Sequence, residues 1–334
     1  MKPEFFGTLP TGEAVETYTI QNEEATLRVM TYGAAVVNFR VEGVELIGGY
    51  DTLADYLADG DSHQGATIGR VANRVAGACF TMDGKVYHLP ANNNGNCLHG
   101  GIGFDHRVFT VTEATDKSVT LRYISPDGEE GFPARLTVDV TFTLEGSAFM
   151  IDYTATPDGK TPIALTNHSY FNLDGFGGTV DKHTAVIYAD SVTEVDENLI
   201  PNGNHPAVAG TVFDFTTPHT IGERLGNGFG GYDHNYVLNG KVKETVMGRE
   251  LSLAAEVWND TRKLSVYTDQ PGIQFYIGNF LMGKPDFRSG TVKIRHGAFC
   301  LEAQTEPDCI NHGIGFYDKG EVYRQTTVYR VAKL

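Results

Sequence analysis

A two-residue alternation of apolar and polar side chains runs through much of this chain and constrains its fold more than any other feature. In RLTVDVTFTL, residues 135–144, every second residue from Leu136 onward is apolar and the residues between them are polar. SVTLRYI at 118–124 and AFMIDYTA at 148–155 repeat the alternation. This period is typical of β-strands that bury one face. The sequence therefore predicts a protein built largely from strands.

Most of the other predicted strands are bounded by Gly, Asp, Asn or Pro, which favour turns. They cover 15–21, 26–31, 35–41, 106–113, 161–171, 184–189, 250–258, 263–268, 272–280, 291–304 and 321–332. Short helices are predicted only at 51–59, with Asp51 as the N-cap, and at 218–226. Because long helical patterns do not separate the strands, the sheets should be mainly antiparallel. The predicted fold class is all-β, a large antiparallel β-sandwich forming a single domain over residues 1–334.

Composition narrows the possible partners and location. The chain has 334 residues, 41% of them hydrophobic, which is enough for a large core. Its net charge of −16 argues against nucleic-acid binding through a basic surface. No apolar run approaches the length of a membrane span, and the N-terminal residues lack a signal-peptide core. We therefore expect a cytoplasmic protein without nucleic-acid or membrane partners, whose four cysteines are reduced because none has a CxxC spacing.

Two ionisable residues, Glu302 and His168, lie in segments that otherwise resemble buried strands. Glu302 shares a predicted strand face with Cys300 and Gln304, so this face is only mildly polar. A carboxylate partly removed from water becomes more basic, which suits a general base, although a solvent-facing strand carboxylate is the simpler alternative. His168 shares its predicted face with Tyr170, and an aromatic ring beside polar groups suits a sugar. A hydrogen-bonded core histidine is the alternative there.

Two further segments carry polar residues suited to binding. His99 lies in NNNGNCLHGG, a Gly- and Asn-rich stretch that must form a loop, where an exposed turn histidine is the alternative. Asn73 and Arg74 lie in GRVANRV, where they could equally be surface residues of a strand edge. Arg70 in the same segment competes for any role given to Arg74.

The last candidates are Asp233 and Gln274. Asp233, next to His234, opens a predicted strand after a glycine-rich turn, and a turn aspartate needs no function. Gln274 alternates with apolar residues in PGIQFYIGNF and could be an ordinary exposed polar residue. The sequence has no HExxH motif, no zinc-type His/Cys spacing, no Walker A motif and no G-x-S-x-G motif. We therefore predict neither a metal nor a cofactor.

Taken together, these segments resemble the aldose 1-epimerase family, also called galactose mutarotases. The resemblance covers nearly the whole chain, because nine pieces occur in the family's order. The pieces are GRVANRV, NCLHGG, SPDGEEGFPARL, TNHSYFNL, VDENLIPNG, FDF, GYDHNYVL, PGIQFYIGNF and CLEAQTEPD. The resemblance implies the family's β-supersandwich fold. It also implies activity on free hexoses such as galactose and glucose, with loops 240–250 and 281–291 bearing on the preferred sugar.

Roles for individual residues follow from the resemblance. Glu302 matches the catalytic base, His168 the catalytic acid and His99 a second active-site histidine. The matched sugar-binding positions are Asn73, Arg74, Asp233 and Gln274. We add Tyr170 to the sugar-binding set because of its place beside His168.

Interconversion of α and β anomers needs one base for the C1 hydroxyl and one acid for the ring oxygen, and no cofactor. We expect mutual attraction to keep His168 protonated and Glu302 ionised. Three alternatives remain: a hexose-6-phosphate 1-epimerase, a non-catalytic carbohydrate-binding protein, and a glycosidase using Asp233 and Glu302 as its carboxylate pair. The expected partner is a small aldohexose, and the chain is expected to be a monomer or a homodimer.

Overall fold

The computed structural model describes residues 1–226 and 228–334 and is dominated by antiparallel sheets. A ten-stranded sheet, a five-stranded sheet and a four-stranded sheet are joined by four two-stranded ribbons. Every strand pairing within them is antiparallel. The all-β antiparallel fold class predicted from alternation is confirmed.

The five-stranded sheet contains β1 (Glu4–Thr8), β2 (Ala14–Gln21), β3 (Ala25–Met30), β4 (Ala35–Val41) and β5 (Val44–Glu45), in that order. The ten-stranded sheet has the order β11 (Thr110–Ala114), β12 (Ser118–Ser125), β13 (Leu136–Glu145), β14 (Ala148–Pro157), β27 (Tyr323–Lys333), β23 (Arg262–Thr268), β22 (Arg249–Trp258), β17 (Thr184–Ile187) and β19 (His219–Thr220), with β21 (Lys243–Val246) also paired to β22. The four-stranded sheet has the order β18 (Ala189–Val192), β20 (Asp233–Leu238), β24 (Gly272–Tyr276) and β25 (Cys300–Gln304).

The two-stranded ribbons pair β6 (Thr67–Ile68) with β16 (Thr166–Asn167), β7 (Arg74–Val75) with β10 (Cys97–Leu98), β8 (Cys79–Met82) with β9 (Lys85–His88), and β15 (Thr161–Pro162) with β26 (Phe316–Tyr317). Among the described residues the α-helical content is one short helix, α1 (Leu53–Ala58). Single 3-10 turns occupy Gly60–Ser62, Ala76–Ala78, Phe104–His106, Glu129–Gly131, Ile221–Arg224, Arg288–Gly290 and Cys309–His312. No helix in the described part of the chain has the length and apolar character needed to cross a membrane.

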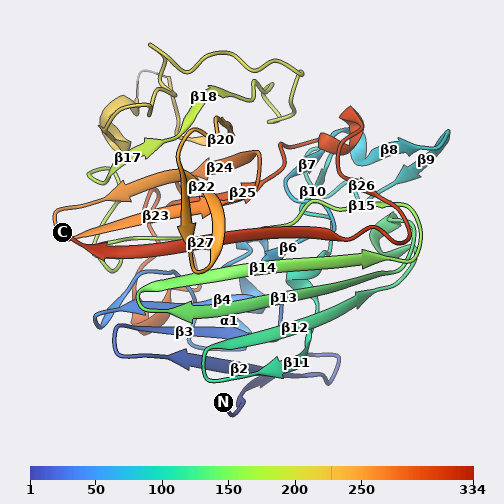
Figure 1. Ribbon diagram of the computed structural model, residues 1–334, viewed down its shortest axis with the longest axis horizontal. Coiled ribbons are helices and arrows are strands. Elements are labelled where there is room, and N and C mark those ends of the chain that lie inside the picture. Colours follow the sequence, from blue (N-terminus) through green and yellow to red (C-terminus); the bar gives the residue numbers. More distant parts are fainter. Residues whose placement is uncertain (227) are drawn as a thin grey trace.

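The main core lies between the five-stranded sheet and the ten-stranded sheet. β13 buries Leu136, Val138, Val140, Phe142 and Leu144 and leaves the residues between them partly exposed, as its alternation predicts. β2 and β3 contact β13 across this core, and the blue strands β3 and β4 overlap the green strands β12 and β13 in the view of Figure 1. Phe39 of β4 meets Phe149 of β14 with ring centroids 4.7 Å apart. This packing of two inner faces gives the sandwich its apolar interior.

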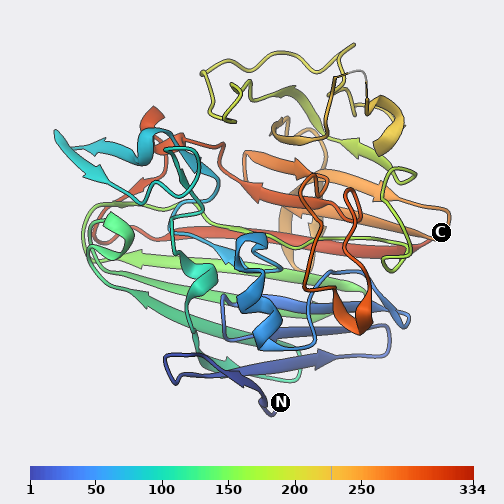
Figure 2. The ribbon, with the colours of Figure 1, turned by 180° about the vertical axis from the view of Figure 1, so that it is seen from behind.

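The four-stranded sheet rests on the ten-stranded one and carries polar residues toward the opposite side. The Tyr329 hydroxyl of β27 donates to the Leu301 carbonyl of β25 at 2.8 Å, which ties the two sheets together. Figure 2, seen from behind, shows α1 and the loop that leads into β25 on the near face of the molecule. Loops and short ribbons, not long strands, therefore form this second face.

Several predicted elements are shorter than the sequence indicated. The predicted strand 161–171 is reduced to β15 and β16, because the backbone N–H groups of Ile163, Ala164 and Leu165 bond to three different partners instead of one neighbouring strand. The predicted strand 291–304 is strand only in β25, since the chain turns at 294–297. In helix α1 the N-cap is Thr52 and not Asp51, because the Thr52 hydroxyl accepts from the Asp55 N–H.

Candidate active site

A cleft of about 320 Å³ opens between the loops of the second face and the four-stranded sheet. Seven of the eight sequence-predicted site residues line it, and Gln274 does not. The lining consists of Asp59, Asp61, Ser62, His63, Asn73, Arg74, Asn93, Leu98, His99, His168, Tyr170, Asp233, Tyr276, Phe280, Leu281 and Glu302. These residues come from segments spread over more than two thirds of the chain, so the cleft exists only in the folded protein.

Glu302 sits at the centre of β25 and is 2% exposed. Its Oε1 lies 3.7 Å from His168 Nε2, and its Oε2 has no hydrogen-bond partner within the described residues. Burial raises the pKa of Glu302 well above its usual range, the negative charge of Asp233 raises it further, and the Arg74 guanidinium opposes the rise. A buried carboxylate that lines a cleft and has an unpaired oxygen among the described residues has the properties of a general base.

His168 follows β16 and is held from both sides by the backbone of residues 65–66. Its N–H donates to the Ala66 carbonyl at 2.9 Å, and its carbonyl accepts from the Gly65 N–H at 2.9 Å. Burial lowers the pKa of His168 to about 3. The directions of the two pKa shifts contradict the expectation of a His168–Glu302 ion pair. Burial disfavours both charges more strongly than their attraction across 3.7 Å favours them.

The four-stranded sheet places three polar residues in a row beneath the cleft. Cross-strand register sets Gln274 of β24 opposite Glu302 on one side and opposite Asn235 of β20 on the other. The Gln274 amide donates to Asp233 Oδ1 at 2.7 Å. Gln274 thus contacts the cleft residue Asp233 from below, and its own side chain is buried outside the cleft lining.

Asn73 and His99 are joined by two hydrogen bonds, one of which involves the His99 ring. The Asn73 N–H donates to His99 Nδ1 at 3.1 Å, and the His99 N–H donates to the Asn73 carbonyl at 2.9 Å. Because Nδ1 accepts, the neutral His99 ring carries its proton on Nε2. Burial lowers the pKa of His99 well below its ordinary value, so this neutral form prevails near pH 7. Both residues have left-handed backbones, with φ of 60° and 55°, a conformation that non-glycine residues seldom adopt outside special sites.

The structure separates the two arginines of GRVANRV. Arg74 lines the cleft, and its guanidinium contacts Asn73 Oδ1 and Asn93 Oδ1 at 3.3 Å each. Arg70 is buried elsewhere, where it donates to the carbonyls of residues 133 and 134 and to two hydroxyl groups. Arg74 is therefore the arginine that can reach a molecule in the cleft, and Arg70 holds the surrounding loops together.

One group of described residues gathers potential metal ligands: His168, Cys300 and Glu302, whose ligand atoms lie within 4.8 Å of one another. However, the Cys300 sulfur faces His168 Nδ1 at 3.7 Å, whereas Glu302 faces Nε2. The shortest contacts of the two partners therefore involve different nitrogens of the His168 ring. This arrangement suits a buried thiol donating to Nδ1 better than a metal centre, and the absence of a metal stays a prediction.

Several cleft residues were not anticipated from the sequence. Asp59 is held by the buried ammonium of Lys293 at 2.7 Å, and Lys293 also donates to the Tyr50 hydroxyl at 3.2 Å. Phe280 lies at the rim with 78% of its surface exposed. His63 lies in the wall beside His99. An aspartate- and glycine-rich stretch that contains a lone histidine, DGDSHQG, was the one available signal for the first and last of these.

The fold and the cleft together define a class: antiparallel β-proteins with a small-molecule site built on a buried carboxylate and buried imidazoles. The aldose 1-epimerase family model matches residues 16–330. The chain is 39% identical to galactose mutarotase of Rattus norvegicus, covering 97% of this chain and 96% of the relative. It is 35% identical to aldose 1-epimerase of Escherichia coli K12, covering 96% of each.

Solved structures agree with the sequence matches. An aldose epimerase homologue from C. elegans superposes with a TM-score of 0.88 at 28% identity and covers 96% of this chain and 100% of its own. Galactose 1-epimerase from Lactobacillus acidophilus superposes with a TM-score of 0.88 at 25% identity, covering 99% of each chain. The chain belongs to the aldose 1-epimerase family.

Proposed function

We propose that this chain is an aldose 1-epimerase, a mutarotase that interconverts the α and β anomers of free hexoses such as galactose and glucose. The observation that carries the proposal is the facing pair of Glu302 and His168, 3.7 Å apart at the floor of the cleft. Opening a pyranose ring requires removal of the C1 hydroxyl proton and protonation of the ring oxygen. The hydroxyl oxygen and the ring oxygen are both bonded to C1. A base and an acid held side by side can therefore reach both.

The protonation states of the pair fit this chemistry. Glu302 as carboxylate with His168 as imidazolium holds one shared proton, and so does the neutral carboxylic acid with neutral imidazole. When Glu302 takes the C1 hydroxyl proton and His168 protonates the ring oxygen, the first arrangement becomes the second. Burial favours the neutral arrangement, which is the one that accompanies the open-chain aldehyde. After rotation about C1–C2, the reverse transfers close the ring to the other anomer.

Other cleft residues have chemistry suited to binding the sugar. Asp233, fixed by Gln274, would accept hydrogen bonds from sugar hydroxyls. Arg74 and the Nε2–H of His99 would donate to sugar oxygens as negative charge develops on them. Tyr170, whose ring lies 4.9 Å from that of His168, would pack against a C–H face.

The charge of the cleft argues against a phosphorylated substrate. Arg74 is the single lysine or arginine among the described residues lining it, whereas Asp59, Asp61, Asp233 and Glu302 also line it. A phosphate group is usually held by several basic side chains. A neutral hexose is therefore favoured over a hexose 6-phosphate.

Polarimetry tests the proposed function. Freshly dissolved α-D-galactose and α-D-glucose should reach anomeric equilibrium faster with catalytic amounts of the protein, and treatment with EDTA should leave the rate unchanged. Buffer with bovine albumin at the same concentration controls for general catalysis. An unchanged rate with both sugars would contradict the proposal, as would release of reducing sugar from glycosides.

Four narrower expectations accompany this proposal. We expect a cytoplasmic enzyme, a single domain over residues 1–334, and a monomer or a homodimer. We also expect loops 240–250 and 281–291 to influence the choice of sugar. The second loop directly follows Phe280 and Leu281 at the cleft, which supports its involvement.

A further inference from the structure

His63 is a cleft residue to which the reaction outlined above gives no role. It follows the 3-10 turn Gly60–Ser62 and lines the same cleft as Glu302. Its ring centroid lies 4.6 Å from that of His99 and 5.7 Å from that of His168. Three imidazoles thus form one cluster, in which His63 is the member nearest to the surface turn.

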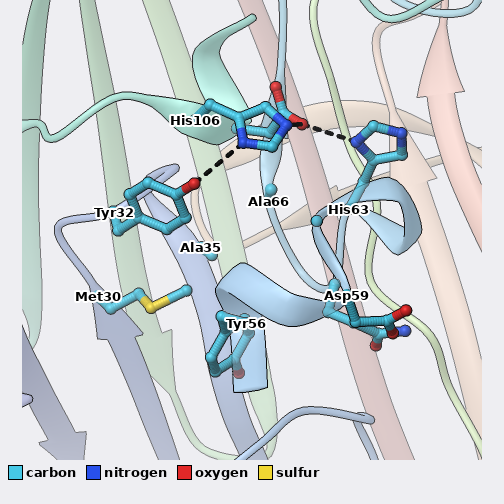
Figure 3. A pocket seen from close by; sticks show the side chains of 11 residues that line it. Met30, Tyr32, Ala35, Tyr56, Asp59, His63, Ala66 and His106 are labelled. Atoms are coloured by element: carbon cyan, nitrogen blue, oxygen red, sulfur yellow. Dashed lines mark hydrogen bonds and ion pairs between the residues drawn. The ribbon is translucent and has the colours of Figure 1, made fainter. Parts of the chain in front are cut away.

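A buried carboxylate fixes the orientation of His63. Its Nδ1 lies 2.7 Å from Asp105 Oδ2, and Asp105 is 5% exposed. Asp105 Oδ2 also lies 3.2 Å from His106 Nε2, and the Nδ1 of His106 contacts the Tyr32 hydroxyl at 3.0 Å. Figure 3 shows His106 and His63 on either side of this network, with Tyr32 beyond His106. The network therefore holds His63 through its Nδ1 atom on a buried carboxylate.

This anchoring leaves the second nitrogen of His63 free for a ligand. A carboxylate only accepts, so His63 Nδ1 carries the proton that it donates to Asp105. Among the described residues, no hydrogen bond involves Nε2, and this atom is not among the buried polar atoms without a partner. An accessible, unpaired imidazole nitrogen in a wall of the cleft is a hydrogen-bond acceptor for a hydroxyl group.

We propose that His63 is a further sugar-binding residue, which accepts a hydrogen bond from one hydroxyl of the bound hexose through Nε2, and that Asp105 is its positioning residue. The inference rests on the proposed function for its ligand. A purely structural role explains less, because Asp105 already has His106 as a second partner. The backbone of His63 adopts a left-handed φ of 53°, a conformation that non-glycine residues seldom adopt outside special sites.

The test compares two matched variants. His63→Asn keeps a polar group at the Nδ1 position and removes the cleft nitrogen, and Asn tolerates a left-handed φ. His106→Asn makes the same change in the other histidine bound to Asp105, which does not line the cleft. Binding of D-galactose is measured by NMR titration of the His99 and His168 ring signals, which reports affinity with or without turnover.

We expect His63→Asn to weaken galactose binding about tenfold, the value of one hydrogen bond, and His106→Asn to leave it within twofold. His63→Gln, whose amide reaches the Nε2 position, should recover most of the loss. In a panel of monodeoxy-galactoses, one sugar should bind wild type and His63→Asn equally, because it lacks the hydroxyl that His63 accepts from.

Two results would overturn the proposal. One is equal weakening by His63→Asn for every sugar of the panel, or no weakening at all. The other is a His63 ring signal in the wild-type protein that does not move when galactose saturates the cleft, which decides the matter even if a variant fails to fold. Failure of the proposed function is a separate result, seen as absent mutarotation by a wild-type protein whose His63 signal still responds to sugar.

Discussion

The inward residues of the sandwich core and the facing pair of Glu302 and His168 are buried to a similar degree, with opposite consequences. On β13 every inward residue is apolar, so burial there stabilises the fold. In the cleft, Glu302 and His168 are buried nearly as completely, and burial shifts both toward their neutral forms. Stability and chemistry are therefore divided between two regions. The sandwich core is stabilised by the exclusion of water, and in the cleft the same exclusion shifts the pKa values of Glu302 and His168.

The largest expected effect is on catalysis. Glu302→Gln keeps the side-chain shape and removes the base, so we expect kcat to fall about 10²-fold to 10⁴-fold with sugar binding largely kept. The same variant, Glu302→Gln, should increase folding stability at high pH. Because the pKa of Glu302 is raised in the folded state, its contribution to stability is lost as pH rises through that pKa. Glu302→Gln should therefore raise Tm at pH 8 and leave it unchanged at pH 4.

The control for this variant is Glu306→Gln. Glu306 lies beyond the end of β25, is not in the cleft, and contacts His205 Nε2 at 2.6 Å. Polarimetry should give near wild-type rates for it. A rate loss in Glu306→Gln with normal activity in Glu302→Gln would show that the wrong carboxylate has been assigned.

A core substitution should produce the reverse pattern. Phe142 on β13 is fully buried against the five-stranded sheet. Phe142→Ala should lower the free energy of unfolding by about 3–5 kcal/mol, through lost burial and the cavity left behind. Kinetic constants of the folded fraction should stay within twofold of wild type, measured at a temperature well below Tm. A selective loss of kcat without loss of stability would break the division between the two regions.

The pH dependence of kcat/KM tests the protonation states of Glu302 and His168. We expect kcat/KM to be bell-shaped, because the pair must hold one proton. With the pKa of His168 lowered and that of Glu302 raised, the acidic limb reports His168 gaining a proton and the basic limb reports Glu302 losing one. This order reverses the one expected from an ion pair, and each limb belongs to the coupled pair. An NMR titration should find the His168 ring neutral at pH 6; an imidazolium there would contradict this assignment.

The last expected effect concerns stability in acid and is spread over several pH units. His168 has a folded-state pKa of about 3, below the ordinary value of 6.5, so the unfolded chain binds its proton first. Stability should fall as pH drops from 6.5 toward 3, with a slope from this residue of up to about 1.4 kcal/mol per pH unit. Denaturant unfolding of His168→Asn should show a shallower slope in this window. The exposed residue His88 offers the matched control, and His88→Asn should keep the wild-type slope.

The long strands were predictable because packing enforces what alternation indicates. β13 and β14 match their predicted segments closely, since each buries one face along its length. The segment around His168 was not predictable in this way. Only Thr166 and Asn167 pair as strand, and the residues that follow satisfy their backbone groups through loop partners. A periodic pattern predicts a ladder, but it carries no information about which distant carbonyl accepts each N–H.

The site was predictable where a residue lies in a recognisable motif and not where geometry alone creates its role. Glu302 and Arg74 were indicated by CLEAQ and GRVANRV. His63 has no such motif, and its place in the cleft depends on Asp105, which is 42 residues away. Gln274 was assigned to the sugar; the register of β24 sets it opposite Asn235 and Glu302, and its amide donates to Asp233, so its contact with the sugar stays a prediction. The charge states of Glu302 and His168 were also predicted wrongly, because they depend on the burial of both side chains, which the sequence does not give.

The backbone clasp around His168 makes catalysis a late reporter of folding. The amide of Asn167, adjacent to it, donates to the Gly65 carbonyl across 102 residues of chain, so His168, the proposed acid, reaches its place only after a very long loop has closed. Contacts between residues so distant in sequence form slowly. During refolding, strand signals should return before mutarotation does, and the enzyme's own activity then serves as a sensor for the last long-range step of its assembly.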